Sequence, residues 1–232
     1  MTPTTQTYAE LQQAFDHFNA ALFDGQLPPC LMTLQRQARV WGFYSAQRFV
    51  HGTAGDHIDE IAINPAYIAA YPLIQTLQTI THEQTHAWQN HLGRPGRRGY
   101  HNTEWADKME AIGLMPSHTG TPGGRRTGEK MSDYPIPGGR FLTACEELVT
   151  AEFTISWLDR FPAAGGETLS PGSAGSGSAL CLAGGLTRPL PPPKPATRTR
   201  FMCPGCKAKV WAKPGLEIDC RPCGRAFQPT GR

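Results

Sequence analysis

Apolar residues near the start of the chain recur at the period of a helix. Within residues 8–22, apolar side chains lie three or four positions apart, as on one face of an amphipathic helix: Tyr8, Leu11, Phe15, Phe18 and Leu22. Gly25 and Pro28 are expected to end this helix. The next apolar or alternating segments predict strands at residues 30–36, 40–49 and 60–65.

A second amphipathic helix is predicted from Pro72 to Leu92. Its apolar stripe consists of Leu73, Ile74, Leu77, Ile80, Ala87 and Trp88. Gly93 and Pro95 follow directly and form a stop signal, because glycine suits the residue after a helix and proline cannot continue one.

The rest of the first 162 residues predicts fewer regular elements. Residues 102–112 and 141–149 predict helices, and residues 153–161 predict a strand. Residues 116–140 are rich in Gly and Pro and predict a long loop, which in a compact domain is usually functional or disordered. Strands and helices in this mixture favour an α+β fold.

Composition divides the chain into three parts. Residues 1–162 can supply one core, since 39% of the whole chain is hydrophobic. Residues 163–200 are dominated by Gly, Ser and Pro and predict a linker that is flexible at first and stiffer in its proline-rich part. Residues 201–232 form a separate small module.

Charge is distributed unevenly between these parts. Residues 1–162 hold 12 Lys+Arg against 16 Asp+Glu, a balance of −4, whereas residues 163–232 hold 10 against 3, a balance of +7. A basic tail predicts a polyanionic partner, of which nucleic acid is the commonest; the alternative is a tail that only aids solubility.

Location is inferred from what the sequence does not contain. No apolar run approaches the roughly 20 residues that span a bilayer, and the N-terminus lacks a basic start followed by an apolar run. We therefore expect no membrane contact and a cytoplasmic location, including association with the nucleoid. In a reducing compartment, closely paired cysteines favour metal binding over disulfides.

The second predicted helix carries the pattern H-E-x-x-H at residues 82–86. Residues four apart in a helix differ by about 40° in direction and one turn in height, so His82 and His86 can reach one ion. Both point away from the apolar stripe. Glu83 flanks them and is placed to take a proton from a water held by the metal.

A hydrolytic zinc site needs a third protein ligand and one open position. His91 lies about 140° around the helix from His86, towards the apolar stripe, and is interpreted as a semi-buried residue at the helix end. His101 follows a turn-rich link and is favoured as the third ligand. Glu104 is the competitor, and otherwise an orienting carboxylate. The remaining histidines are interpreted as loop or surface residues: His17, His51, His57 and His118.

Several segments in order resemble the SprT-like metalloprotease family, whose eukaryotic relatives are the Spartan DNA–protein crosslink proteases. They are THEQTHAWQ, GRPGRRGYHNTEWADKMEAIGLMPSHTGTPGGRRTG, YPIPGGRF and the C-terminal four-cysteine module. The resemblance covers residues 8–161 and that module. It implies a zincin-like domain in which a small sheet packs on helices, with His101 as third ligand and Glu83 as catalytic residue. One departure is Asp133, which stands before Tyr134 where the family often has a histidine.

The terminal module contains the spacing C-x2-C-x13-C-x2-C, close to that of a zinc ribbon: Cys203, Cys206, Cys220 and Cys223. Four sulfurs close the coordination sphere, so the predicted zinc is structural. A module of this size is too small to fold on a core alone, and the metal is expected to supply much of its stability. A redox role is disfavoured because two matched pairs are present.

The same module has residues suited to nucleic acid. Basic side chains surround an aromatic one, and together they form the predicted interface: Lys207, Lys209, Trp211, Lys213, Arg221 and Arg225. Alternatively, Trp211 packs on the module itself. Cys30 and Cys145 are interpreted as small apolar residues, and Cys181 as such a residue or an exposed linker thiol.

These observations predict a monomeric zinc metallopeptidase of the HExxH…H type that acts on proteins at or near DNA and holds two zinc ions, one catalytic and one structural. Glu83 would be the general base of a zinc-activated water, with Tyr134, Arg125 or Arg126 as a donor to the oxyanion. The rivals are a non-catalytic nucleic-acid-associated zinc protein, such as a transcription or DNA-repair adaptor, and a zinc hydrolase that does not cleave proteins.

Overall fold

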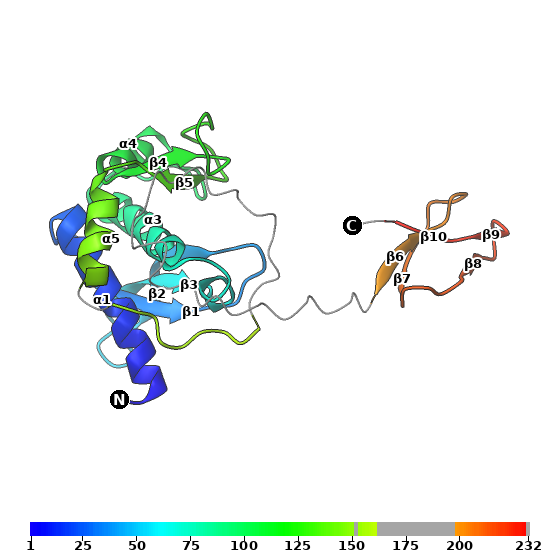
Figure 1. Ribbon diagram of the computed structural model, residues 1–232, viewed down its shortest axis with the longest axis horizontal. Helices are drawn as coiled ribbons and strands as arrows, with labels where there is room; N and C mark the ends of the chain where they lie inside the picture. The colour runs from blue at the N-terminus through cyan, green and yellow to red at the C-terminus, as the bar shows by residue number, and fades with distance from the viewer. Residues whose placement is uncertain (151–152, 162–197, 231–232) are drawn as a thin grey trace. The chain divides into compact units, whose positions relative to one another are not determined.

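The computed structural model describes residues 1–150, 153–161 and 198–230, which belong to two compact units (Figure 1). The first unit contains residues up to 161 and the second residues 198–230. The predicted linker, residues 163–200, lies outside the described residues except for its last three. Of those, Thr199 and Arg200 already belong to a strand, so the second unit begins earlier than predicted.

Helix α1 (Pro3–Phe23) confirms the first predicted helix. The Thr2 hydroxyl accepts a hydrogen bond from the Thr5 N–H at its start, and Asp24 ends it in the left-handed conformation. The buried face includes Leu11, Ala14, Phe15, Phe18, Leu22 and Phe23. Tyr8, predicted on that face, is 41% exposed.

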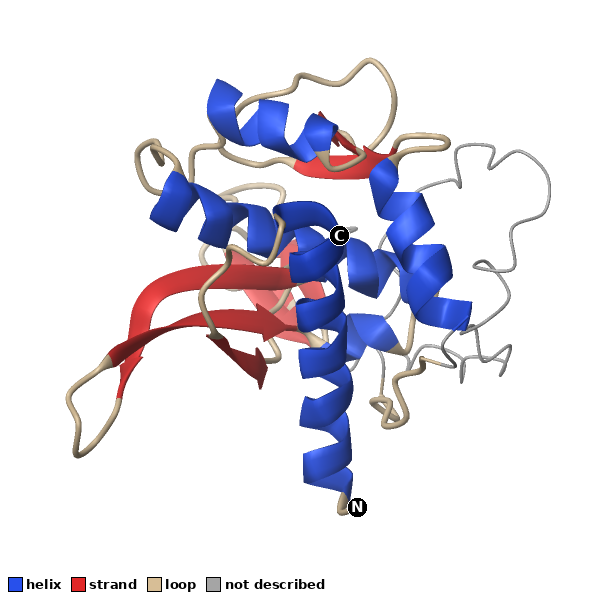
Figure 2. Cartoon of the chain, turned by 90° about the vertical axis from the view of Figure 1, so that its left-hand side faces the viewer, coloured by secondary structure: helices blue, strands red, loops and turns tan. Residues whose placement is uncertain are grey.

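Three strands form a sheet in the order β1-β3-β2. They are β1 (Cys30–Leu34), β2 (Gly42–Val50) and β3 (His57–Ile63). Strand β1 runs parallel to β3, and β2 pairs antiparallel with β3, with a shift of register between Ser45 and Phe49. The three predicted strands are therefore confirmed, and β2 lies at an edge of the sheet. Figure 2 shows the sheet as a layer beside the helices.

Helix α3 (Leu73–Leu92) follows a short helix, α2 (Pro65–Ile68), that the sequence did not predict. It contacts β2 and β3 on one side and α1 and α4 on others (Figure 1). Its apolar stripe is buried or partly buried as predicted. The opposite face is covered as well, since Gln89 is 3% exposed and the His82 side chain 13% exposed. The central position of α3 explains this difference from the predicted open face.

The segment after α3 is more ordered than predicted. It contains α4 (Thr103–Ala111), β4 (Leu114–Ser117), β5 (Ser132–Pro135) and α5 (Arg140–Thr150). The helices at 102–112 and 141–149 are confirmed. The predicted loop 116–140 is wrong in part. It includes the last two residues of β4 and all of β5, and these two strands pair antiparallel.

The strand predicted at residues 153–161 is wrong, since these residues form neither helix nor strand. Their alternation has another cause. Phe153 and Ile155 pack into the core, while the backbone N–H of Ser156 donates to Glu10. The segment is thus held by side chains and single hydrogen bonds rather than by a strand ladder.

The core of the first unit joins all its helices. Phe18 of α1 stacks on Phe141 of α5 with ring centroids 5.8 Å apart, and Trp105 of α4 is fully buried. Cys30 and Cys145 lie in this core, as predicted, whereas Cys181 lies outside the described residues. Among the described helices, none combines the length and the apolar character that crossing a bilayer demands.

The second unit is built from short strands. Its sheet has the order β10-β6-β7, and β8 pairs with β9. The strands are β6 (Thr199–Met202), β7 (Lys209–Ala212), β8 (Asp219–Cys220), β9 (Arg225–Ala226) and β10 (Gln228–Pro229). Among the described residues of this unit, Phe201 is the one large apolar side chain that is buried, so apolar packing alone gives the unit little stability.

Gly42 brings β2 close to α3. A Cβ atom there would lie 2.7 Å from Thr79 Cγ2 and 2.9 Å from the Ala62 carbonyl oxygen. We predict that Gly42→Ala lowers the free energy of unfolding by about 1–3 kcal/mol, the usual cost of overpacking. Gly52→Ala is the matched control, because no atom lies within 4 Å of its added Cβ. Chemical denaturation of both variants checks this, and equal stabilities would contradict the close approach.

Candidate metal centres

Three histidines converge in the first unit. One ring nitrogen of each of His82, His86 and His101 lies within 4.8 Å of the others. The Nε2 atoms of His86 and His101 are 3.1 Å apart, and the ring centroids of all three pairs are 4.7–5.6 Å apart. The structure thus brings together the three ligands that the sequence predicted, although no contact of this kind involves His91.

Two different elements supply these rings. His82 and His86 are one turn apart on α3, as their spacing requires. His101 precedes α4 and is fixed by an antiparallel bridge to Gly128, with its N–H donating to the Gly128 carbonyl at 2.8 Å and its carbonyl accepting at 3.1 Å. Asn102 then starts α4 by accepting from the Trp105 N–H. The third ring is therefore placed by two loops held against each other.

Hydrogen bonds to Nδ1 orient two of the rings. The Nδ1 of His82 is 2.8 Å from Oδ2 of Asp133, and the Nδ1 of His101 is 3.1 Å from the Gly128 carbonyl oxygen. A carboxylate and a carbonyl can only accept, so each Nδ1 carries a proton. In the neutral ring each Nε2 then presents a lone pair, which is what a divalent cation requires of imidazole.

The pKa values of the rings agree with such a centre. Burial, followed by the charge of His82, lowers the pKa of His101 to about 4. Burial and the charges of His82 and His101 also hold the pKa of His86 well below its ordinary value. Burial opposes protonation of His82 too, but its bond to Asp133 and the charge of Glu83 raise its pKa. Two neutral rings beside carboxylates form a set that suits a cation.

Trp105 forms one wall of this centre. Its ring centroid lies 4.4 Å from that of His101, 5.0 Å from that of His82 and 5.5 Å from that of His86. The indole is fully buried. It therefore keeps water from one side of the three rings and restricts the directions in which they can move. No sequence pattern assigned Trp105 to the site. Its position next to Glu104, a candidate ligand on the same predicted helix, is the one feature that could have indicated it.

Glu83 lies between α3 and the edge strand. Its side chain is 6% exposed, and burial raises its pKa to about 7 even though the charge of His82 and the backbone N–H of Tyr44 act in the opposite direction. Gly42 of the edge strand lies next to this side chain, because a Cβ atom added there would be 3.5 Å from Glu83 Cγ. A carboxylate with this pKa is able to accept and release a proton near neutral pH.

Asp59 of β3 fixes the strand that contacts Glu83. Its carboxylate accepts from the Tyr44 hydroxyl at 2.6 Å, from the Gln47 backbone N–H at 2.8 Å and from His91 Nε2 at 2.6 Å. Burial opposes its ionisation, but these hydrogen bonds lower its pKa. His91 lies at the end of α3, as expected, but it is exposed and not semi-buried; its bond to Asp59 ties the helix to the sheet.

Asp133 takes the orienting role that the sequence analysis gave to Glu104, so that assignment is wrong. The Glu104 carboxylate accepts from Gln89 Nε2 at 2.8 Å and from the Arg94 N–H at 2.6 Å, and it closes the turn after α3. His17 was also misjudged as a surface residue, because its ring bonds to the Ala144 carbonyl at 2.7 Å.

Two of the candidate oxyanion donors, Tyr134 and Arg126, are engaged away from the three histidine rings. Tyr134 follows Asp133 in β5, and neighbours in a strand point to opposite faces, so its side chain is directed away from the side on which Asp133 meets His82. Arg126 pairs with Asp107 at 2.8 Å and with Glu110. The donor role of Tyr134 remains a prediction that this geometry disfavours.

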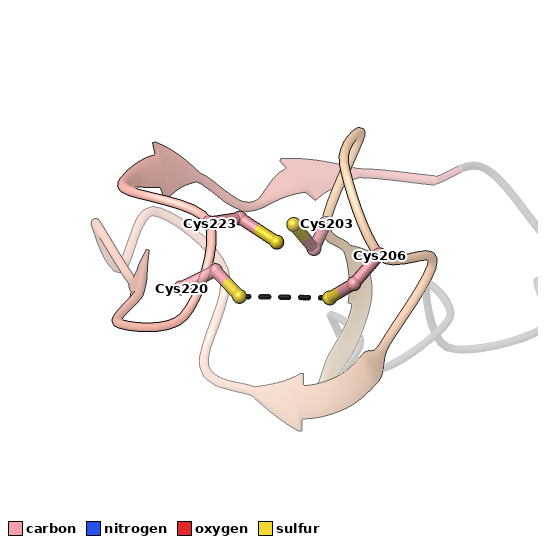
Figure 3. Close-up of side chains that lie close together, drawn as sticks. All are labelled: Cys203, Cys206, Cys220 and Cys223. Atoms are coloured by element: carbon pink, nitrogen blue, oxygen red, sulfur yellow. Dashed lines mark hydrogen bonds between the residues drawn. The ribbon is translucent and has the colours of Figure 1, made fainter.

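Four cysteines converge in the second unit (Figure 3). Their Sγ atoms all lie within 4.8 Å of one another, and those of Cys206 and Cys220 are 3.6 Å apart. Backbone N–H groups of Cys206 and Gly205 favour the thiolate of Cys203, whose pKa is lowered to about 6 against the effect of burial. The cluster could bind zinc through four sulfurs, which would leave no position for water.

The two halves of this cluster repeat one turn. The Lys207 N–H donates to the Cys203 carbonyl at 3.0 Å, and the Gly224 N–H donates to the Cys220 carbonyl at 2.8 Å. Both donors have positive φ, 62° and 58°. Glycine adopts this conformation freely, whereas Lys207 adopts it at some cost. The same backbone turn therefore directs both pairs of sulfurs inward.

The residues predicted to meet nucleic acid lie on the surface of the second unit. Trp211 is 62% exposed on β7, so it does not pack on the unit as the alternative required. The predicted basic side chains are exposed as well: Lys207, Lys209, Lys213, Arg221 and Arg225.

Comparisons with known proteins found one family model and a similar protein. The model of the SprT-like family matches residues 11–124, which include the three histidines and Glu83. An uncharacterized protein in the mucB 3′ region of Salmonella typhimurium is 54% identical over 59 residues, which are 25% of this chain and 80% of that protein. No solved structure matched the chain.

The role of Asp133 can be tested by zinc affinity. We predict that Asp133→Ala weakens zinc binding at the histidine centre about 10–100-fold, because His82 loses the acceptor that orients its ring. Glu104→Ala is the matched control and is expected to leave the affinity unchanged. Competition with a chelating dye measures both, in a Cys206→Ser/Cys220→Ser background that removes the other cluster. A stronger effect of Glu104→Ala would reverse the two assignments.

Proposed function

Because the chain belongs to the SprT-like family, whose function is zinc-dependent and protease-like, we propose that it is a zinc metallopeptidase acting on proteins at or near DNA. The observation that carries the proposal is the convergence of three histidine rings beside a buried carboxylate. His82 and His86 are ligands on one helix, His101 is the third, and Glu83 lies one residue from the first. This donor set supports the proposal of an HExxH…H site in a zincin-like domain.

The chemistry divides between the ion and the side chains. A zinc ion bound by the three imidazoles would lower the pKa of a coordinated water and polarise a peptide carbonyl. Glu83 takes the proton of the attacking water and passes it to the leaving amine. The backbone N–H of Tyr44 favours the ionised form of Glu83, and the Tyr44 hydroxyl donates to Asp59.

The surroundings of the centre support positioning of a peptide. Strand β2 is an edge strand that passes next to Glu83, so an extended substrate can add to it through main-chain hydrogen bonds. Asp133 and Gly128 keep the rings of His82 and His101 in one orientation. Trp105 excludes water from the opposite side of the rings.

The second unit supplies the proposed contact with DNA. Its exposed lysines and arginines suit the phosphate backbone, and the exposed ring of Trp211 offers a surface on which a base can stack. A zinc ion held by four cysteines would stabilise this unit without taking part in the reaction. The substrate would then be protein that is already bound to DNA, met by a monomer in the cytoplasm or at the nucleoid.

Glu83→Gln tests the reaction. The variant keeps the shape of the side chain but cannot accept a proton, so cleavage of a DNA-bound test protein is expected to fall by about 10²–10⁴-fold. Glu104→Gln, which changes a carboxylate outside the three histidines, should retain activity. Zinc content and thermal unfolding serve as checks that both variants are folded. If the unaltered chain cleaves nothing with or without DNA, itself included, the non-catalytic adaptor replaces this proposal. If it hydrolyses small amides but no protein, the chain is a hydrolase of another class.

Metal analysis of the full chain tests the two centres separately. We predict two zinc ions per chain, because three imidazoles and four thiolates form independent donor sets. His86→Ala/His101→Ala and Cys206→Ser/Cys220→Ser should each lose one ion and keep the other. Elemental analysis by mass spectrometry measures the ratio. A single ion in the unaltered chain would contradict one of the centres.

A further inference from the structure

The cations of the first unit are concentrated in two loops next to His101. Residues 1–162 carry more acidic than basic residues, 16 against 12. Six of those 12 basic residues nevertheless lie in residues 93–100 and 118–131: Arg94, Arg97, Arg98, Arg125, Arg126 and Lys130. Glu129 is the single acidic residue in the two segments. Half of the positive charge of an acidic unit therefore lies in two short segments.

Contacts between the loops place this charge at the histidine centre. The bridge between His101 and Gly128 joins the end of one loop to the other. An ion pair between Arg97 and Glu129, at 2.5 Å, joins them a second time. The bridge and the ion pair thus bring the two basic segments together next to the backbone of the third histidine.

Only part of this charge is neutralised. Arg126 pairs with two carboxylates of α4, and Arg97 pairs with Glu129. The other four have no ion pair among the described residues and are exposed; we call them the histidine-flanking rim: Arg94, Arg98, Arg125 and Lys130. Their unpaired charge is directed at solvent in a unit whose balance is otherwise negative.

An aromatic ring lies in the first of the two basic segments. Tyr100 is 37% exposed, and the Arg97 guanidinium lies 5.2 Å from its ring centroid. Gly96 and Gly99 on either side of the arginines add no bulk, and Gly99 has a φ of 75°. A partly exposed ring beside a guanidinium group, in a segment with further arginines, is suited to a base and its phosphates.

We propose that the histidine-flanking rim binds the phosphodiester backbone of single-stranded nucleic acid, independently of the second unit. Arginine, which supplies three of its four members, contacts phosphate oxygens through two parallel hydrogen bonds. Tyr100 gives a face for one base. An acidic polypeptide would pair with the charges of the rim but has no base to stack on the Tyr100 ring. The consequence for proteolysis rests on the proposed function: a strand held beside His101 keeps its bound protein next to Glu83.

Salt-dependent binding of the full chain to a short fluorescein-labelled single-stranded oligonucleotide tests the proposal. The rim variant is Arg94→Gln/Arg98→Gln/Arg125→Gln. Its matched control is Arg36→Gln/Arg39→Gln/Arg160→Gln, which removes the same charge from the same unit. Both are also made in a Lys209→Gln/Trp211→Ala/Lys213→Gln background, where the contribution of the second unit is reduced. Fluorescence anisotropy gives the dissociation constant at each salt concentration.

The rim variant is expected to lower the slope of log K against log salt by about 2, since each lost phosphate contact with a single strand removes about 0.7. The control should keep the slope of its parent. Equal slopes for rim and control variants, with equal unfolding midpoints and zinc contents, would overturn the proposal. So would a polyglutamate of matched charge that displaces the oligonucleotide at equal concentration, because the rim would then be a site for acidic protein.

The binding experiment stands apart from the reaction. Glu83→Gln is expected to bind the oligonucleotide with the slope of the unaltered chain, since Glu83 is buried and outside the rim. A chain that cleaves no protein would therefore contradict the proposed function and leave the binding result intact.

Discussion

A carbonyl oxygen and a carboxylate cannot donate a hydrogen bond, and this restriction determines what the histidine centre can do. The Gly128 carbonyl and the Asp133 carboxylate each hold an Nδ1 proton, and each thereby turns an Nε2 lone pair inward. The bridge that carries Gly128 and the strand that carries Asp133 both come from the segment after α4. The pairing of β4 with β5 and the burial of Trp105 serve the same arrangement.

The cysteine cluster and the histidine cluster differ in the number of coordination positions that they would leave free on a metal ion. Four sulfurs complete a tetrahedral sphere, and the unit around them has almost no apolar core, so a metal there would contribute mainly to folding. Three nitrogens leave one position, and the unit around them has its own core that joins α1, α3, α4 and α5. With both sites occupied, the proposed function would thus separate a metal for stability from a metal for chemistry.

Local patterns predicted the elements whose partners are close in sequence. The spacing of apolar residues predicted α1, α3, α4 and α5, and the pattern H-E-x-x-H predicted a shared direction for His82 and His86. Residues 153–161 show why such a pattern can mislead. Alternation of apolar and polar residues indicates that one side of the segment is buried, but it does not indicate that a partner strand exists. Strand β5 was missed since its partner is the short β4, separated from it by a long loop.

The orienting carboxylate was beyond local patterns for the same reason. Asp133 is 51 residues from His82, and only tertiary structure brings them together. Glu104, only 22 residues from His82, was the residue that spacing favoured, yet its carboxylate closes the turn at Arg94. Trp105 was equally hidden, because a single tryptophan on a predicted helix does not reveal which neighbours it covers.

His86 and His101 are 15 residues apart, and their Nε2 atoms approach to 3.1 Å. An ion shared by them would act as a cross-link between α3 and the start of α4, and closing a loop of that length restricts the unfolded chain by about 3 kcal/mol in the chain-entropy account. Loss of the ion would therefore destabilise the packing of α4, β4 and β5 first. The sheet of β1, β3 and β2 would stay assembled on α3, because the hydrogen bond between Asp59 and His91 joins them. The centre that performs the chemistry would also fasten one half of the unit to the other.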